Sequence, residues 1–287
     1  MDRRQGDLKH VRAQMGRYEE DLKELCAIPS ISSEPAHRPD MARAAEWLAG
    51  RLRAAGMQNV EVCPTAGHPV VLGECLAAGP GRPTVLVYGH YDVQPAGPLE
   101  QWHSGPFEPV MRGGSLYARG VSDMKGQFWA VLAAVEAVCR SDRPPANVRW
   151  LIEGEEEVGS KSLPAFLEAN AGRLAADFAL NLDAGMIAAG QPSICYGLRG
   201  ITMVELRVLG PRGDVHSGAY GGVIHNPAHA LAALIAGMHD AGGHVAVPGF
   251  YDRVRPLDEA EQAETARLPV TPETLLAETG SPALWGE

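Results

Sequence analysis

Short hydrophobic runs bounded by glycine and proline alternate with helical patterns up to about residue 195. The clearest run, Val85 to Tyr88, is closed by Gly89, and a continuous run of this kind predicts a strand buried on both faces. Similar runs predict further strands at residues 60–63, 70–76, 148–152 and 178–182. Strands that alternate with helices along the chain predict the α/β class.

Apolar residues at helical spacing predict helices between these strands. The first helix is expected to stop before Pro29, and the second to run from an Asp40 cap to Ala55. Gly113-Gly114 predicts a hairpin turn. The expected helices cover residues 7–28, 40–55, 128–135, 162–170 and 228–238, the last opened by Asn226-Pro227.

The pattern changes near Tyr196. Residues 201–208 alternate between apolar and polar positions, which predicts a strand with one solvated face. A glycine-rich loop follows over 210–222, and beyond Gly242 the chain is acidic and broken by prolines, with no closing element expected. We therefore expect two domains, residues 1–195 and 196–287.

Composition narrows the class of protein. The 287 residues are 45% hydrophobic and 21% charged, which is ordinary for a soluble globular protein. The net charge of −10 argues against nucleic acid or an anionic membrane as partner. The longest apolar stretch, Phe128 to Cys139, contains Glu136 and is too short to span a bilayer. Five scattered cysteines without a CxxC pair, and no visible signal peptide, predict a cytoplasmic protein with reduced thiols.

Candidate chemistry begins at the carboxyl end of the central strand. His90 and Asp92 follow that strand directly, and open α/β sheets bind ligands outside the carboxyl ends of their strands. A neutral imidazole suits a divalent metal, and Asp92 could fix its tautomer. The alternative is a buried loop histidine bonded to a neighbour. Asp123 likewise could be a metal ligand or simply the N-cap of the helix that follows it.

The acidic run Glu153-Gly154-Glu155-Glu156-Glu157 follows another apolar strand without a break. Acidic runs are usually solvated, but carboxylates crowded at a strand end repel one another unless a cation or proton separates them. Asp183 ends a further strand. Strand ends and loops thus bring several metal-ligand types to what we expect to be one edge: His90, Asp123, Glu156 or Glu157, and Asp183.

Four motifs, in order along the chain, resemble those of the M20 metallopeptidases, in particular the dipeptidase branch with the carnosinase-like enzymes. They are GHYDVQP at 89–95, RGVSDMKG at 119–126, EGEEEVGS at 153–160 and DVHSGAYGG at 214–222. The resemblance covers essentially the whole chain. It implies a zinc-peptidase-like catalytic domain, with a central mixed sheet flanked by helices, over 1–195. Residues 196–287 would be an incomplete α+β lid or dimerisation domain.

The resemblance also implies two divalent metal ions bridged by a carboxylate. Zinc is the first expectation, with manganese or cobalt as alternatives. Asp123 would be the bridge, His90 and Asp183 would complete one metal, and Glu157 would ligate the second. Glu156 would be the general base. Because three glutamates are adjacent here, we assign their roles from Gly159-Ser160, which in the family follow the ligand glutamate after one residue.

Two further residues receive roles from the resemblance. Asp92 would orient His90, and His216 would reach the active site of a partner subunit. The family's second metal needs another histidine, and none of the remaining histidines of this chain lies in a matching motif. We therefore expect the chain to be the N-terminal portion of a longer enzyme, with exposed apolar edges and poor solubility.

The expected activity is hydrolysis of the peptide bond in dipeptide-like substrates, by a metal-activated water with a glutamate as general base. A homodimer through the lid domain is expected if that domain is complete. Two alternatives remain open: an N-acyl amino acid deacylase or related amidohydrolase of the same family, and a non-catalytic remnant that only binds metal or dimerises.

Overall fold

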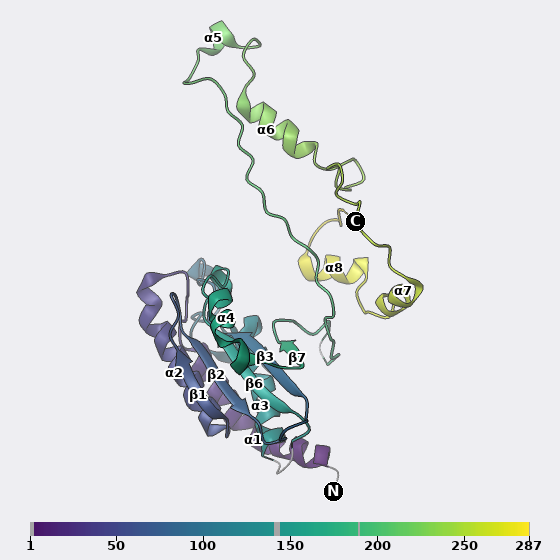
Figure 1. Ribbon diagram of the computed structural model, residues 1–287. Coiled ribbons are helices and arrows are strands. Elements are labelled where there is room, and N and C mark those ends of the chain that lie inside the picture. The colour runs from purple at the N-terminus through teal and green to yellow at the C-terminus, as the bar shows by residue number, and fades with distance from the viewer. Residues whose placement is uncertain (1–2, 141–143, 189, 287) are drawn as a thin grey trace. The chain divides into compact units, whose positions relative to one another are not determined.

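The computed structural model describes residues 3–140, 144–188 and 190–286. These residues form two compact units, 1–185 and 186–287, which we describe separately (Figure 1). This division reflects compactness alone, so the division into a catalytic domain and a lid domain stays a prediction. No helix in the described part of the chain is long and apolar enough to cross a membrane.

A five-stranded mixed sheet organises the first unit. Its strands are β1 (Gln58–Cys63), β2 (Val70–Cys75), β6 (Asn147–Glu153), β3 (Thr84–His90) and β7 (Phe178–Asn181), in that spatial order. β1, β2 and β6 pair antiparallel, whereas β6, β3 and β7 run parallel. The carboxyl ends of β3, β6 and β7 therefore meet at one edge, and the predicted α/β class with a central mixed sheet is confirmed.

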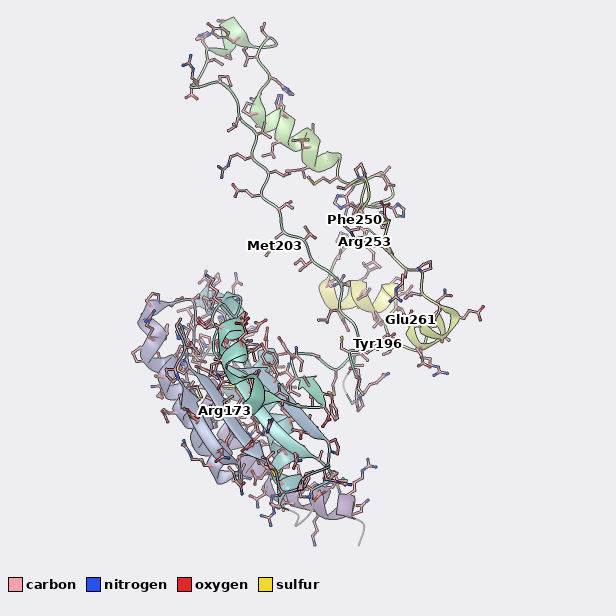
Figure 2. The ribbon with its side chains drawn as sticks, viewed as in Figure 1. Arg173, Tyr196, Met203, Phe250, Arg253 and Glu261 are labelled. Carbon is pink, nitrogen blue, oxygen red and sulfur yellow. The ribbon has the colours of Figure 1, made fainter. Side chains whose placement is uncertain are left out.

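Helices cover the two faces of the sheet unequally (Figure 1). α1 (Arg3–Cys26), α2 (Arg38–Ala54) and α3 (Gly126–Cys139) pack on one face around the larger hydrophobic cluster. α4 (Leu163–Leu174) covers the other face over a smaller cluster. Arg173 lies near the end of α4 (Figure 2) and forms an ion pair with Glu61 of β1 at 2.7 Å.

The expectation that the central strand is buried on both faces is wrong, because the helices cover the two faces of the sheet unequally. Val87 of β3 points to the larger cluster and is buried, while Leu86 and Tyr88 face the smaller cluster and are only half-buried. β7 lies at the edge of the sheet, with Phe178 and Leu180 exposed. An edge strand with one neighbour and little helix cover keeps apolar side chains in contact with solvent.

The predicted cap of the second helix is wrong. α2 begins at Arg38, after a short turn at Pro35–His37, and His37 occupies the cap position. Proline is tolerated in the first turn of a helix, where its missing N–H is not needed, so Pro39 lies inside α2. Asp40 instead lies in that first turn and pairs with His37 Nδ1 at 2.7 Å.

The predicted hairpin turn is confirmed. β4 (Val110–Arg112) and β5 (Ser115–Tyr117) pair antiparallel around Gly113-Gly114. Both glycines have positive φ, 56° and 83°, as a two-residue turn of the favoured twist requires.

The second unit contains the helices α5 (Ser217–Tyr220), α6 (Pro227–Ala236), α7 (Glu259–Thr265) and α8 (Pro272–Thr279). α6 starts as predicted, with Asn226 Oδ1 accepting a hydrogen bond from the Ala228 N–H. α7 and α8 were not expected from the proline-broken sequence.

The strand predicted at 201–208 is wrong. A strand needs a partner for its backbone hydrogen bonds, and no described residue pairs with this stretch. Most of its side chains are exposed, Met203 by 87%, and Figure 2 shows Met203 on this extended segment.

Candidate metal centre

His90, the last residue of β3, lies at the centre of the candidate site. Its side chain is fully buried, which fixes the ring within the edge of the sheet. Nδ1 lies 3.0 Å from the Asp92 carbonyl oxygen and 3.3 Å from Asp92 Oδ1. Nε2 faces the other way, 3.2 Å from Asp123 Oδ1, 3.9 Å from Asp183 Oδ2 and 4.0 Å from Glu156 Oε2. The two ring nitrogens therefore serve two different groups of oxygens.

His90, Asp123 and Asp183 offer ligand atoms that all lie within 4.8 Å of one another. Strand ends explain this meeting, because β3 ends at His90 and the parallel β7 ends two residues before Asp183. Asp123 arrives from the turn that precedes α3. An imidazole and two carboxylates at this spacing can hold a divalent cation.

Asp123 does not cap α3, so the N-cap alternative is wrong. α3 begins at Gly126, and Asp123 belongs to the preceding turn, Val121–Lys125. Its side chain is 64% exposed and directed to His90 Nε2 at 3.2 Å. The alternative that His90 is only a buried loop histidine accounts for one ring nitrogen. Nδ1 contacts Asp92 in the neighbouring loop, whereas Nε2 faces Asp123.

Asp92 connects the histidine to the acidic turn. It is completely buried, and its carboxylate accepts backbone hydrogen bonds from the N–H groups of Glu156 at 3.3 Å and Glu157 at 3.1 Å. The same carboxylate lies beside His90 Nδ1. One buried side chain therefore holds both the imidazole and the start of the turn Glu156–Val158.

The two predicted glutamates occupy different positions. Glu156 directs a carboxylate oxygen toward His90, whereas Glu157 Oε2 accepts a hydrogen bond of 2.8 Å from Gln94 Nε2. Among the residues that the structure describes, neither Glu156 nor Glu157 is in the group whose ligand atoms lie mutually close. Both glutamates therefore lie at the margin of the cluster, Glu156 on the side of His90 and Glu157 on the side of Gln94.

The electrostatics of the cluster favour a bound cation. Burial lowers the pKa of His90, but the hydrogen bond and charge of Asp92, with Glu156 and Asp183, raise it overall to about 9. Burial is the main cause that raises the pKa of both Glu156 and Glu157, and neighbouring carboxylates raise it further. A bound divalent cation would relieve the repulsion among these carboxylates. The donor set therefore fits hard or borderline divalent metals.

Two buried charged residues near the cluster were missed by the sequence analysis. Glu153, the last residue of β6, accepts hydrogen bonds from Tyr88 and Ser160. The signal in the sequence was its place as the first residue of the acidic run, directly after a predicted strand. Lys125 is fully buried, so that burial lowers its pKa to about 8.

Lys125 supports the turn that carries Asp123. Its Nζ donates to the carbonyl oxygens of Leu25 and Ile28, each at 3.1 Å, at the end of α1. A lysine is favoured near a helix C-terminus, where carbonyl groups lack partners. The sequence signal, a lysine immediately before a largely apolar helix, was visible but not interpreted.

His216 lies in the second unit, at the cap position of the short helix α5. Its Nδ1 accepts a hydrogen bond from the Gly218 N–H at 3.0 Å. A role for His216 in an active site stays a prediction.

Comparison with known proteins adds to this geometry. The model of peptidase family M20/M25/M40 matches residues 86–275. The human Beta-Ala-His dipeptidase is 34% identical over 268 residues, which are 88% of this chain and 53% of that protein. The Cys-Gly metallodipeptidase dug1 of Schizosaccharomyces pombe is 30% identical, over 91% of this chain and 57% of the relative.

The solved structure of the dipeptidase Dug1p from Saccharomyces cerevisiae matches 98% of this chain and 62% of its own, with a TM-score of 0.76 and 27% identity. The chain spans little more than half the length of the curated relatives that it matches. The matched range includes all the residues of the candidate metal centre. The chain belongs to peptidase family M20/M25/M40.

Proposed function

We propose that this chain carries the metal site of a dipeptidase that hydrolyses the peptide bond of dipeptide-like substrates. The observation that carries the proposal is the convergence of His90, Asp123 and Asp183 at the carboxyl end of the sheet, with Asp92 behind the histidine and Glu156 beside it. The relatives named above are dipeptidases by name, which favours a dipeptide over an N-acyl amino acid as substrate.

Two divalent metal ions, zinc in the first place, are proposed as the cofactors. Asp123 would bridge them, His90 and Asp183 would complete one site, and Glu157 would contribute to the other. When bound, such a metal pair polarises a peptide carbonyl and makes hydroxide available at neutral pH. The crowding of carboxylates with raised pKa values around one imidazole supports this assignment.

Glu156 is the proposed general base. Its raised pKa suits a group that accepts a proton from water and passes it to the leaving amine. With a metal bound, Asp92 would hold Nδ1–H of His90 and leave Nε2, which faces Asp123 and Asp183, as the ligand atom. His216 is proposed to contact substrate across a homodimer.

The first experiment is titration of the metal-free 287-residue chain with Zn²⁺ or Mn²⁺, followed by assays with β-Ala-His and Cys-Gly. We expect one or two metal equivalents, lost in Asp123→Asn and retained in the control Glu168→Gln, which alters an exposed carboxylate on α4. Glu156→Gln should keep the metal and abolish turnover.

The outcomes separate the candidate functions. A folded chain that binds no metal would contradict the proposed site. Stoichiometric metal with no cleavage of either dipeptide would favour the metal-binding remnant. Normal activity of Glu156→Gln would show that the general base is another residue.

A further inference from the structure

Glu153 is a buried carboxylate for which the proposed chemistry has no use. It lies at the end of β6, is 1% exposed, and stands opposite His90 in the parallel pairing of β3 and β6. Its Oε1 accepts two hydroxyl hydrogen bonds, from Tyr88 at 2.6 Å and from Ser160 at 2.8 Å. Its Oε2 is buried and has no hydrogen-bond partner among the described residues.

The two hydroxyl donors come from the two sides of the candidate site. Tyr88 lies on β3, two residues before His90. Ser160 closes the acidic turn, where its N–H donates to the Glu155 carbonyl at 2.7 Å. The Glu153 carboxylate therefore joins the strand that carries His90 to the far end of the turn that carries the two candidate glutamates.

The acidic turn is held by a carboxylate at each end. Asp92 accepts the N–H groups of Glu156 and Glu157 at its start, and Glu153 accepts the Ser160 hydroxyl at its end. Ser160 has a φ of +48°, a left-handed conformation that is costly for a residue other than glycine. A fixed partner for its side chain helps to hold that conformation.

A purely structural role explains Glu153 poorly. A buried carboxylate with one unpartnered oxygen is costly, and a neutral side chain would pack at lower cost. What a carboxylate adds is a pair of short, charge-assisted hydrogen bonds, which are stronger and more directional than neutral ones. Here they fix the positions of the Tyr88 and Ser160 hydroxyl groups relative to Glu153.

We propose that Glu153 is a positioning residue that fixes the acidic turn against β3, so that Glu156 and Glu157 meet a metal bound at His90, Asp123 and Asp183. This inference rests on the proposed function. It assigns to Glu153 a role in metal geometry without direct contact with the metal.

The test is Co²⁺ and Zn²⁺ binding to the metal-free 287-residue chain, with the visible spectrum of bound Co²⁺ as a report on ligand geometry. The variants are Glu153→Gln, which keeps an acceptor for both hydroxyls, and Glu153→Leu, which keeps none. Tyr88→Phe and Ser160→Ala each remove one bond and leave Glu153 in place. Ser162→Ala serves as the matched control, because its hydroxyl makes no bond to Glu153.

We expect Glu153→Leu to weaken metal binding by about tenfold or more, as loss of outer contacts does at other metal sites, and to change the Co²⁺ spectrum. Glu153→Gln should restore most of the affinity. Ser160→Ala should change the spectrum in the same direction as Glu153→Leu, and Ser162→Ala should not change it. If Glu153→Leu does not fold, Ser160→Ala and Tyr88→Phe decide the question on their own.

Wild-type affinity and spectrum in folded Glu153→Leu, or in both hydroxyl variants, would overturn the inference and leave the proposed metal site intact. Absence of metal from the wild-type chain would overturn the proposed function together with this inference. Equal losses in Glu153→Gln and Glu153→Leu, with an unchanged Co²⁺ spectrum, would indicate a general loss of stability and also overturn it.

Discussion

The two units of the chain differ in how they are stabilised. Every buried hydrophobic side chain of the described residues lies in the first unit, between Tyr18 and Leu182. In the second unit, residues such as Ile194, Leu198 and Ile201 are more than four-fifths exposed. The first unit therefore has a core that can order a site, whereas the second has locally capped helices without a core of its own.

Helix capping by local side chains and burial of apolar surface are therefore separate sources of structure. Asn226, Asp258 and Thr271 each cap a helix of the second unit through a side-chain oxygen. Such caps contribute about 1 kcal/mol each, much less than the conformational entropy of an ordered segment. The candidate metal ligands all belong to the unit that buries its apolar surface.

Hydrogen exchange should show the largest difference between the units. Amides of β3 and β6 pair on both sides within the sheet, whereas residues 194–209 make no ladder hydrogen bonds in the described chain. We expect protection factors in the two strands to exceed those in 194–209 by about 10³-fold or more. Measurement by mass spectrometry checks this, and comparable protection in both regions would contradict the difference in stability between the two units.

A matched pair of isoleucines tests the same contrast by mutation. Ile152 is 0% exposed in β6, and Ile201 is 84% exposed in the second unit. Ile152→Ala should lower the free energy of unfolding by about 2–5 kcal/mol, because it leaves a cavity in the core. Ile201→Ala should change it by less than about 0.5 kcal/mol. Urea unfolding followed by circular dichroism measures both, and equal effects would show that Ile201 is packed in solution.

Metal binding should stabilise the first unit alone. At a free Zn²⁺ concentration of 100 times Kd, the free energy of unfolding should rise by about 2.7 kcal/mol. His216→Ala, a change in the second unit, should keep that gain, and Asp123→Asn should lose it. Thermal unfolding with and without Zn²⁺ provides the readout. A gain that depends on His216 would link the metal site to the second unit.

The smallest effect is expected at a helix cap. Thr271 and Thr274 form a reciprocal capping box at the start of α8. Thr271→Ala should destabilise that helix by about 1 kcal/mol and leave unfolding of the first unit unchanged. Exchange rates of the α8 amides measure the first effect, and thermal unfolding of the sheet measures the second. A lower unfolding temperature of the sheet would show that the two units are energetically coupled.

The sequence predicted most of the first unit because its strands are apolar runs with clear boundaries. His90, Asp123 and Asp183 were expected at one edge, and the structure brings their ligand atoms together. Strand polarity explains this success for His90 and Asp183, since parallel strands deliver their last and following residues to the same edge, whereas Asp123 comes from the turn before α3.

Strand pairing, the start of the second helix and the position of Glu153 could not be predicted from the sequence. The partner of a strand cannot be read from the strand itself, which is why residues 201–208 were predicted wrongly. Asp40 satisfied the composition of a cap, but Pro39 allowed the helix to begin earlier. Glu153 was read with the acidic run, because only the register of β6 against β3 reveals its position behind the site.

That register has a consequence for which insertions and deletions the chain can tolerate. Side chains of a strand alternate between the faces of a sheet, so a shift of β3 by one residue against β6 would turn His90 away from Asp123. The exposed loop before β3, with Gly79 and Gly81 at positive φ, can change length without such a shift. Homologues and engineered variants should therefore vary in length at this loop, whereas the number of residues in β3 and in β6 should not change.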